Sequence, residues 1–192
     1  MRHPRRAEES RTGCTTKGGR TMTRILVSTA SKHGATHEIG DAIAAALEAK
    51  GIEAFTTHAA DVTSLEGVDA VVIGSGVYAG RWLEPAKALI DRFQAELRLL
   101  PVWLFSSGPL DGAQKPDDVP LDAVAMIEMS GARAHRVFAG RLTPGDLGFA
   151  ERAVVKLVKA PYGDFRDWAE ISAWASEIAE AVVPADVAAA SR

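Results

Sequence analysis

The chain has 192 residues, of which 47% are hydrophobic, and this is enough for one globular domain with a sizeable core. Its single cysteine, Cys14, excludes an intrachain disulfide and a cysteine-based metal cluster, and fits a reducing, cytoplasmic compartment. No stretch is long and apolar enough to form a membrane-spanning helix.

The first 21 residues differ in composition from the rest of the chain. They hold six of the 22 basic side chains and two of the 25 acidic ones, without apolar periodicity. We expect 1–21 to be a disordered N-terminal extension, with Met22 as a candidate true start of the product. The apolar core of a secretory signal is missing, and Glu8 and Glu9 disfavour a transit peptide. The remaining 16 basic and 23 acidic side chains give a net charge of −7, which argues against nucleic acid as a partner.

The first predicted elements are a strand and a helix between residues 24 and 51. The continuous apolar run at 25–27 predicts a strand that is covered on both faces. Apolar residues then recur at helical spacing, and Gly51 stands where a helix C-terminal cap belongs. This apolar face consists of Ile39, Ala42, Ile43, Ala46 and Leu47.

The segment between this strand and this helix is small, polar and rich in hydroxyl groups. It consists of Ser31, Lys32, His33, Gly34, Ala35 and Thr36. The first amides of a helix lack carbonyl partners, and the helix dipole is positive there. Gly34 allows the backbone to approach an anion, while Ser31 and Thr36 offer hydroxyl donors. The segment therefore predicts a site for a phosphate monoester, with an ordinary strand-to-helix turn as the alternative.

Strand and helix signals alternate along the rest of the chain. Further strands are predicted at 52–57, 70–74, 102–105 and 136–139, and further helices at 83–97, 121–129 and from 167 onward. Asp167 is the expected N-cap of the last helix. The residues that this helix is expected to bury are Trp168, Ile171, Trp174, Ile178 and Val182. This alternation predicts an α/β fold with a five-stranded parallel sheet and helices on both faces. The domain is expected to span 22–183, followed by a C-terminal tail at 184–192.

Two more small-residue segments are predicted loops at the carboxyl ends of strands, where such sheets bind ligands. One contains Ser75, Gly76, Val77, Tyr78, Ala79 and Gly80, and the other contains Ser106, Ser107, Gly108, Pro109 and Leu110. A planar ring could lie between these loops, packed on Tyr78 or Leu110. Alternatively, Tyr78 and Trp82 only cap the sheet. The sequence shows no triphosphate loop, no catalytic Ser-His-Asp set and no metal-ligand cluster, so no catalytic residue is assigned.

The order of elements and the three loops resemble those of flavodoxins over residues 22–183. Ser31, Gly34 and Thr36 match the phosphate loop of that family, S/T-x-T-G-x-T, whereas His33 departs from it. The resemblance implies that the chain binds FMN through the three loops. It also implies a redox role in which the flavin carries out the chemistry.

A narrower resemblance concerns residues 71–82, VVIGSGVYAGRW, and an insertion at 142–166 after the fifth strand. Both are similar to the short, quinone-dependent protoporphyrinogen IX dehydrogenases. This similarity implies an FMN-dependent dehydrogenase with a porphyrinogen-like substrate and a quinone acceptor. Because the insertion carries Arg152, Lys156 and Lys159, it also suggests peripheral contact with the inner face of the cell membrane.

Two other functions remain open at this point. One is an electron-transfer flavodoxin that exchanges electrons with redox partner proteins, and the other is a binding module that has lost its flavin. The insertion favours the dehydrogenase, because an electron carrier has no need of such a segment. Its own alternative is a lid that packs on the sheet edge.

Overall fold

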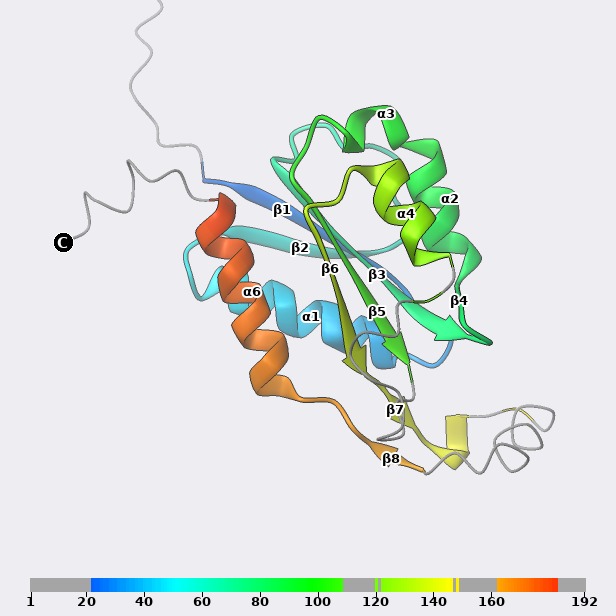
Figure 1. The fold of residues 1–192 in the computed structure, drawn as a ribbon. Helices are drawn as coiled ribbons and strands as arrows, with labels where there is room; N and C mark the ends of the chain where they lie inside the picture. The colour runs from blue at the N-terminus through cyan, green and yellow to red at the C-terminus, as the bar shows by residue number, and fades with distance from the viewer. Residues whose placement is uncertain (1–21, 109–119, 121, 147, 149–161, 183–192) are drawn as a thin grey trace, which may run out of the picture.

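The computed structural model describes residues 22–108, 120, 122–146, 148 and 162–182 (Figure 1). The extension at 1–21, the tail at 184–192 and the middle of the 142–166 insertion lie outside the described residues. Pro109 and Leu110 of the third predicted loop also lie outside them.

A parallel sheet forms the centre of the domain, with the strand order β2-β1-β3-β5-β6. The predicted α/β fold with a parallel five-stranded sheet is thereby confirmed. A short additional strand, β4 (Arg81–Trp82), pairs antiparallel with the end of β3. The parallel strands are β1 (Arg24–Ala30), β2 (Glu53–His58), β3 (Ala70–Tyr78), β5 (Val102–Gly108) and β6 (Ala134–Ala139).

Helices cover both faces of this sheet (Figure 1). One face carries α1 (Ala35–Glu48) and α6 (Trp168–Val182), and the other carries α2 (Glu84–Arg92), α3 (Gln94–Leu97) and α4 (Ala123–Ser130). The three central strands, β1, β3 and β5, are buried on both sides and contain continuous apolar runs, whereas the edge strands β2 and β6 carry polar and partly exposed residues. None of the described helices is long and apolar enough to cross a membrane.

Three aromatic rings fill the core beneath α1 and α6. Phe138 and Trp174 have ring centroids 5.5 Å apart, and Phe105 lies 5.8 and 6.2 Å from them. Gly74 on β3 provides the room for Phe105, because a Cβ atom there would lie 2.0 Å from the ring. These contacts tie the last helix to the centre of the sheet.

Two details of the predicted helices are wrong. The single helix expected at 83–97 is interrupted at Phe93, whose φ of −108° separates α2 from α3. In the last helix, Trp168 is 43% exposed and not buried. The expected N-cap is confirmed, since Asp167 Oδ1 accepts hydrogen bonds from the amides of Ala169 and Glu170 at 2.9 and 3.0 Å.

Beyond β6 the chain forms a second, two-stranded antiparallel sheet of β7 (Arg141–Leu142) and β8 (Gly163–Asp164). A short 3-10 helix, Pro144–Asp146, follows β7. The small sheet lies past the carboxyl end of β6 (Figure 1). The amide of Gly140 donates a 2.6 Å hydrogen bond to the carbonyl of Gly108, which keeps the start of β7 close to the end of β5.

Candidate functional site

The site begins where β1 ends and α1 starts. Gly34 is the N-cap of α1, with a left-handed backbone (φ 85°, ψ −25°), and no atom lies within 4 Å of the position that a Cβ atom would occupy. The Thr36 amide donates to Ser31 Oγ at 3.4 Å, and the Thr36 side chain is only 3% exposed. The turn therefore places the start of a helix, with its positive dipole, beside open space.

The end of β3 lies against this turn. A Cβ atom at Gly76 would lie 3.2 Å from Thr36 Oγ1 and 3.4 Å from the ring of Tyr78, so glycine allows a close approach of the two segments. Tyr78 is 37% exposed, and its ring centroid lies 6.0 Å from that of His33. The Lys32 ammonium lies 5.5 Å from the centre of the Tyr78 ring. The structure thus brings the first two predicted segments together.

The prediction of a loop from Ser75 to Gly80 is wrong, because this segment is part of a β-hairpin. β3 continues through Tyr78, the chain turns at Ala79 and Gly80 with φ of 49° and 73°, and Val77 then pairs with Trp82. Both turn residues adopt left-handed backbone, as tight hairpin turns require. Beyond the apolar run at 70–74, pairing with β4 and β5 keeps the rest of β3 in the sheet.

The hydroxyl groups of Ser75 and Ser106 face the interior of the protein. Ser75 Oγ accepts a 2.9 Å hydrogen bond from the amide of Leu83, at the start of α2. Ser106 Oγ accepts one of 2.8 Å from Trp82 Nε1. Both serines are fully buried. Their hydroxyl groups therefore hold the hairpin and the start of α2 in place and are not available to a ligand.

The third predicted segment lies next to the second. In the parallel register of β3 and β5, Ser75 stands opposite Ser106 and Gly76 stands opposite Ser107. Ala30, the last residue of β1, stands opposite Ser75. The carboxyl ends of β1, β3 and β5 are therefore neighbours, as the predicted ligand site at this edge requires.

Trp82 is a core residue, as the alternative interpretation held. Its side chain is 3% exposed, and its backbone amide donates to both carboxylate oxygens of Asp122 at 3.0 and 3.1 Å. Asp122 precedes α4, so this contact joins the hairpin to that helix.

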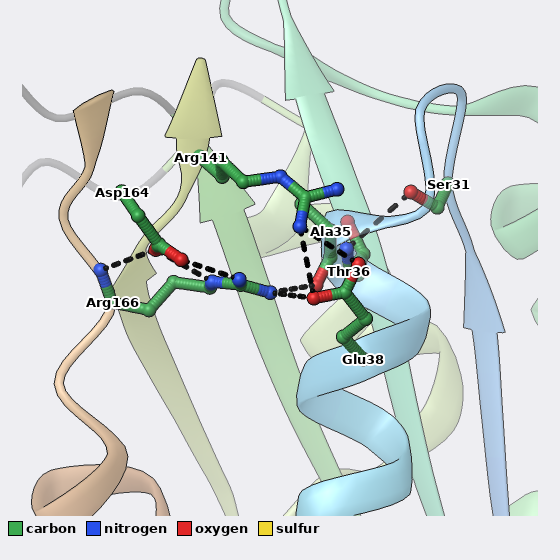
Figure 2. A network of polar contacts seen from close by, with 7 residues as sticks. All are labelled: Ser31, Ala35, Thr36, Glu38, Arg141, Asp164 and Arg166. Atoms are coloured by element: carbon green, nitrogen blue, oxygen red, sulfur yellow. Dashed lines mark hydrogen bonds and ion pairs between the residues drawn. The ribbon is translucent and has the colours of Figure 1, made fainter. Parts of the chain in front are cut away.

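A charged cluster that the sequence analysis did not find lies beside the start of α1 (Figure 2). Glu38, in the first turn of α1, contacts Arg141 Nη1 at 2.9 Å and Arg166 Nη1 at 2.7 Å. Asp164 holds Arg166 from the other side, at 2.6 Å. This hydrogen bonding lowers the pKa of Asp164 below its usual value. The partners are separated by 103 and 128 residues, so no local sequence pattern could have indicated them.

Two histidines meet at the other side of α1. His37 Nδ1 lies 2.6 Å from Thr29 Oγ1, and its Nε2 lies 3.0 Å from Nδ1 of His58. Burial, followed by the neighbouring His58, lowers the pKa of His37. Within the part of the chain that the structure describes, no three histidine, cysteine, aspartate or glutamate side chains are grouped as a metal site.

The described geometry fits a phosphorylated, planar cofactor. The helix start at Gly34 is open, the Thr36 side chain sits between it and β3, and the half-exposed ring of Tyr78 lies alongside. These are an anion site and an aromatic surface at one edge of the sheet.

Comparisons with known proteins agree with this geometry. A family model described as a flavodoxin domain matches residues 26–168. No curated protein sequence matches the chain. Among solved structures, an archaeal flavodoxin is 18% identical over 83% of this chain and 99% of its own, with a TM-score of 0.59. A cysteine-to-serine mutant of Pseudomonas aeruginosa flavodoxin is 15% identical over the same shares of each chain, with a TM-score of 0.55.

A larger protein contains a similar domain. Rubredoxin oxygen:oxidoreductase from the anaerobe Desulfovibrio gigas is 11% identical over 83% of this chain and 36% of its own, with a TM-score of 0.56. At identities this low, the solved structures show only that the fold is shared. The assignment of the chain to a family rests on the match to the family model. The chain belongs to the flavodoxin-domain family and is an FMN-binding redox protein.

Proposed function

We propose that the segment from Ser31 to Thr36 holds the phosphate of FMN. The supporting observations are the open left-handed turn at Gly34 and the start of α1 with its positive dipole. The hairpin residues 75–80 and the end of β5, continuing through 106–110, would then flank the flavin ring. When bound, FMN supplies the acceptor for electrons, and the residues of the chain orient it and shield it from water.

We further propose that the protein is an FMN-dependent dehydrogenase that oxidises a porphyrinogen-like substrate and passes the electrons to a quinone. The observation that carries this proposal is the position of the 142–166 insertion. The two short strands that flank it, β7 and β8, pair with each other, and Arg141 and Arg166 bind this region to the first turn of α1. The insertion is therefore rooted next to the proposed phosphate site, where it can control access of a substrate to the flavin.

The direct test is a reductive half-reaction. The FMN-loaded protein is mixed without oxygen with protoporphyrinogen IX, and flavin bleaching is followed near its visible absorption band. Menadione, a soluble quinone, is then added to follow reoxidation. Bleaching by the porphyrinogen and recovery with the quinone support the proposal, and a flavin that stays oxidised contradicts it.

Replacing residues 149–161, outside the described part, by a short Gly-Ser linker tests the insertion itself. This change leaves β7, β8 and the contacts of Glu38 in place. We expect FMN to stay bound while turnover with the quinone slows. Normal turnover of the shortened protein would show that the insertion has no part in the reaction. Cosedimentation of both proteins with anionic lipid vesicles tests the proposed peripheral membrane contact in the same way.

The second candidate function is an electron-transfer flavodoxin that serves redox partner proteins. It is favoured by the similarity to flavodoxins that align over 99% of their own length. In that case the flavin would not react with the porphyrinogen. Chemically reduced protein would instead pass electrons rapidly to a protein acceptor such as cytochrome c, at a rate that falls with ionic strength.

A further inference from the structure

Two arginines from the C-terminal part of the chain converge on a single acid beside the proposed phosphate site (Figure 2). Arg141 Nη1 lies 2.9 Å from Glu38 Oε1, and Arg166 Nη1 lies 2.7 Å from Glu38 Oε2. Glu38 belongs to the first turn of α1, so both guanidinium groups are held at the end of the helix that faces the turn at Ser31–Thr36.

Arg166 has a structural role, as its surroundings show. Its side chain is only 3% exposed, and Asp164 binds it with two hydrogen bonds, 2.8 Å from Nε to Oδ1 and 2.6 Å from Nη2 to Oδ2. It also packs on the ring of Trp168, 4.4 Å from its centre, and donates to the Ala35 carbonyl at 3.4 Å. Because Asp164 faces it in this two-point pair, the two charges compensate each other.

Arg141 differs from Arg166 in exposure. Its side chain is 27% exposed, and Figure 2 shows its guanidinium over the start of α1, beside Ala35 and Thr36. A guanidinium carries five N–H donors in a planar fork, so it can bind Glu38 and a phosphate oxygen at the same time.

The charge balance at this helix start also requires a cation. Glu38 alone would place a carboxylate in the same helical turn as the bound phosphate, and the two anions would repel each other. With Asp164 compensating Arg166, Arg141 compensates Glu38 and leaves the helix dipole to act on the phosphate.

We propose that Arg141 is a specificity residue of the cofactor site, which binds the FMN phosphate and discriminates FMN from unphosphorylated riboflavin. Glu38 is a positioning residue that fixes the Arg141 guanidinium, and Arg166 in turn fixes Glu38. This inference rests on the proposed placement of the phosphate at Ser31–Thr36. Arg141, the first residue of β7 and just before the insertion, is then part of the flavin site.

The experiment compares FMN and riboflavin as ligands of the full-length apoprotein, with flavin fluorescence quenching as the readout. For Arg141→Gln we expect the dissociation constant of FMN to rise about tenfold, as for the loss of one charge-assisted contact, while that of riboflavin stays within about twofold of the wild-type value. FMN binding should also become less sensitive to salt. The matched control is Arg136→Gln on β6, whose side chain forms an exposed pair with Glu177 at 3.2 Å and which should leave both affinities unchanged.

Two outcomes overturn the proposal: unchanged FMN affinity in Arg141→Gln, or an equal loss of affinity for FMN and riboflavin, which would make Arg141 merely structural. If Arg141→Gln does not fold, Arg141→Lys replaces it, because lysine keeps the charge and loses the planar guanidinium. An unchanged ratio of FMN to riboflavin affinity in Arg141→Lys overturns the proposal. Thr36→Val separates this inference from the placement of the phosphate. If Thr36→Val abolishes the preference for FMN over riboflavin and Arg141→Gln does not, the phosphate lies at Ser31–Thr36 but Arg141 does not bind it. If neither variant changes the preference, the placement itself is wrong.

Discussion

The indole nitrogen of Trp82 donates a 2.8 Å hydrogen bond to the hydroxyl oxygen of Ser106, and so joins the β3–β4 hairpin to β5 inside the core. The same oxygen lies 2.8 Å from Nε2 of His135 on β6. Trp82 is 3% exposed and Ser106 is fully buried. Since buried polar groups are costly when unpaired, this chain of three side chains fixes the hairpin relative to the sheet.

Ser106→Ala is expected to lower the free energy of unfolding by about 1–3 kcal/mol, because the indole N–H of Trp82 would lose its acceptor in the core. FMN affinity should not change, since the hydroxyl is buried and already bonded to Trp82. Urea unfolding and an FMN titration measure the two effects. Ser172→Ala on the exposed side of α6, where the hydroxyl bonds the Trp168 carbonyl, is the matched control. Weaker FMN binding at unchanged stability would contradict this assignment.

The stability of the protein should fall between about pH 6.5 and pH 4 because of His135. Burial lowers the pKa of His135 from 6.5 to about 4, so the unfolded chain binds the proton more readily than the folded one across this range. The contribution of His135 to stability is complete above pH 6.5 and is lost as the pH falls toward 4. His135→Gln, which does not titrate, should flatten the pH dependence in urea unfolding. His37 shifts in the same direction in both proteins and cancels in the comparison.

Gly34→Ala and Gly51→Ala form a matched pair at the two ends of α1. The backbone φ angles are 85° and 79°, and neither position has an atom within 4 Å of a new Cβ. Both substitutions should cost about 1–2 kcal/mol of stability through the left-handed backbone alone. Only Gly34→Ala should also weaken FMN binding, as judged by fluorescence titration. Equal FMN affinities in the two variants would place the phosphate elsewhere.

Gly74→Ala is expected to destabilise the apoprotein by about 1–3 kcal/mol or to prevent folding, because the added methyl group would overlap Phe105 in the core. Gly108→Ala near the end of β5 is the comparison, since its Cβ would meet Val77 at an ordinary 3.5 Å. The two melting temperatures, measured without flavin, test this contrast. Similar values would mean that the ring of Phe105 can move aside at little cost.

A chain that begins at Met22 should keep its FMN and its melting temperature. Residues 1–21 lack an apolar face, and their basic composition contrasts with the acidic remainder. Calorimetry and the flavin spectrum of the shortened and full-length proteins test this. Loss of flavin or a lower melting temperature in the shortened protein would show that the extension packs on the domain.

The sequence predicts features that depend on local pattern and not those that depend on distant contacts. Apolar runs such as 70–74 reveal buried strands, and Asp167 is recognisable as a cap from its own neighbours. The extension of β3 through Tyr78 was missed because pairing with β4 and β5, and not composition, keeps these small residues in the sheet. Trp168 has the helical spacing of a core residue, yet it packs beneath the Arg166 guanidinium.

The cluster around Glu38 shows the same limit at the site. Ser31, Gly34 and Thr36 of the proposed phosphate site lie within one six-residue stretch, so their chemistry can be predicted from the local sequence. Arg141 and Arg166 reach Glu38 only because the sheet topology returns the chain past the end of β6 to α1 (Figure 1). Nothing near either arginine in the sequence indicates this partner.

The pairing of β7 with β8 affects how easily the segment between these two strands can change in length and sequence. Leu142 and Gly163 are partners in one short ladder, so the chain leaves the domain and returns to it at adjacent points. The entropy of closing a loop grows only with the logarithm of its length, so the ladder can carry segments of very different size at similar cost. The ladder is therefore a point at which one peptide can be replaced by another beside the start of α1, while the five parallel strands remain unchanged.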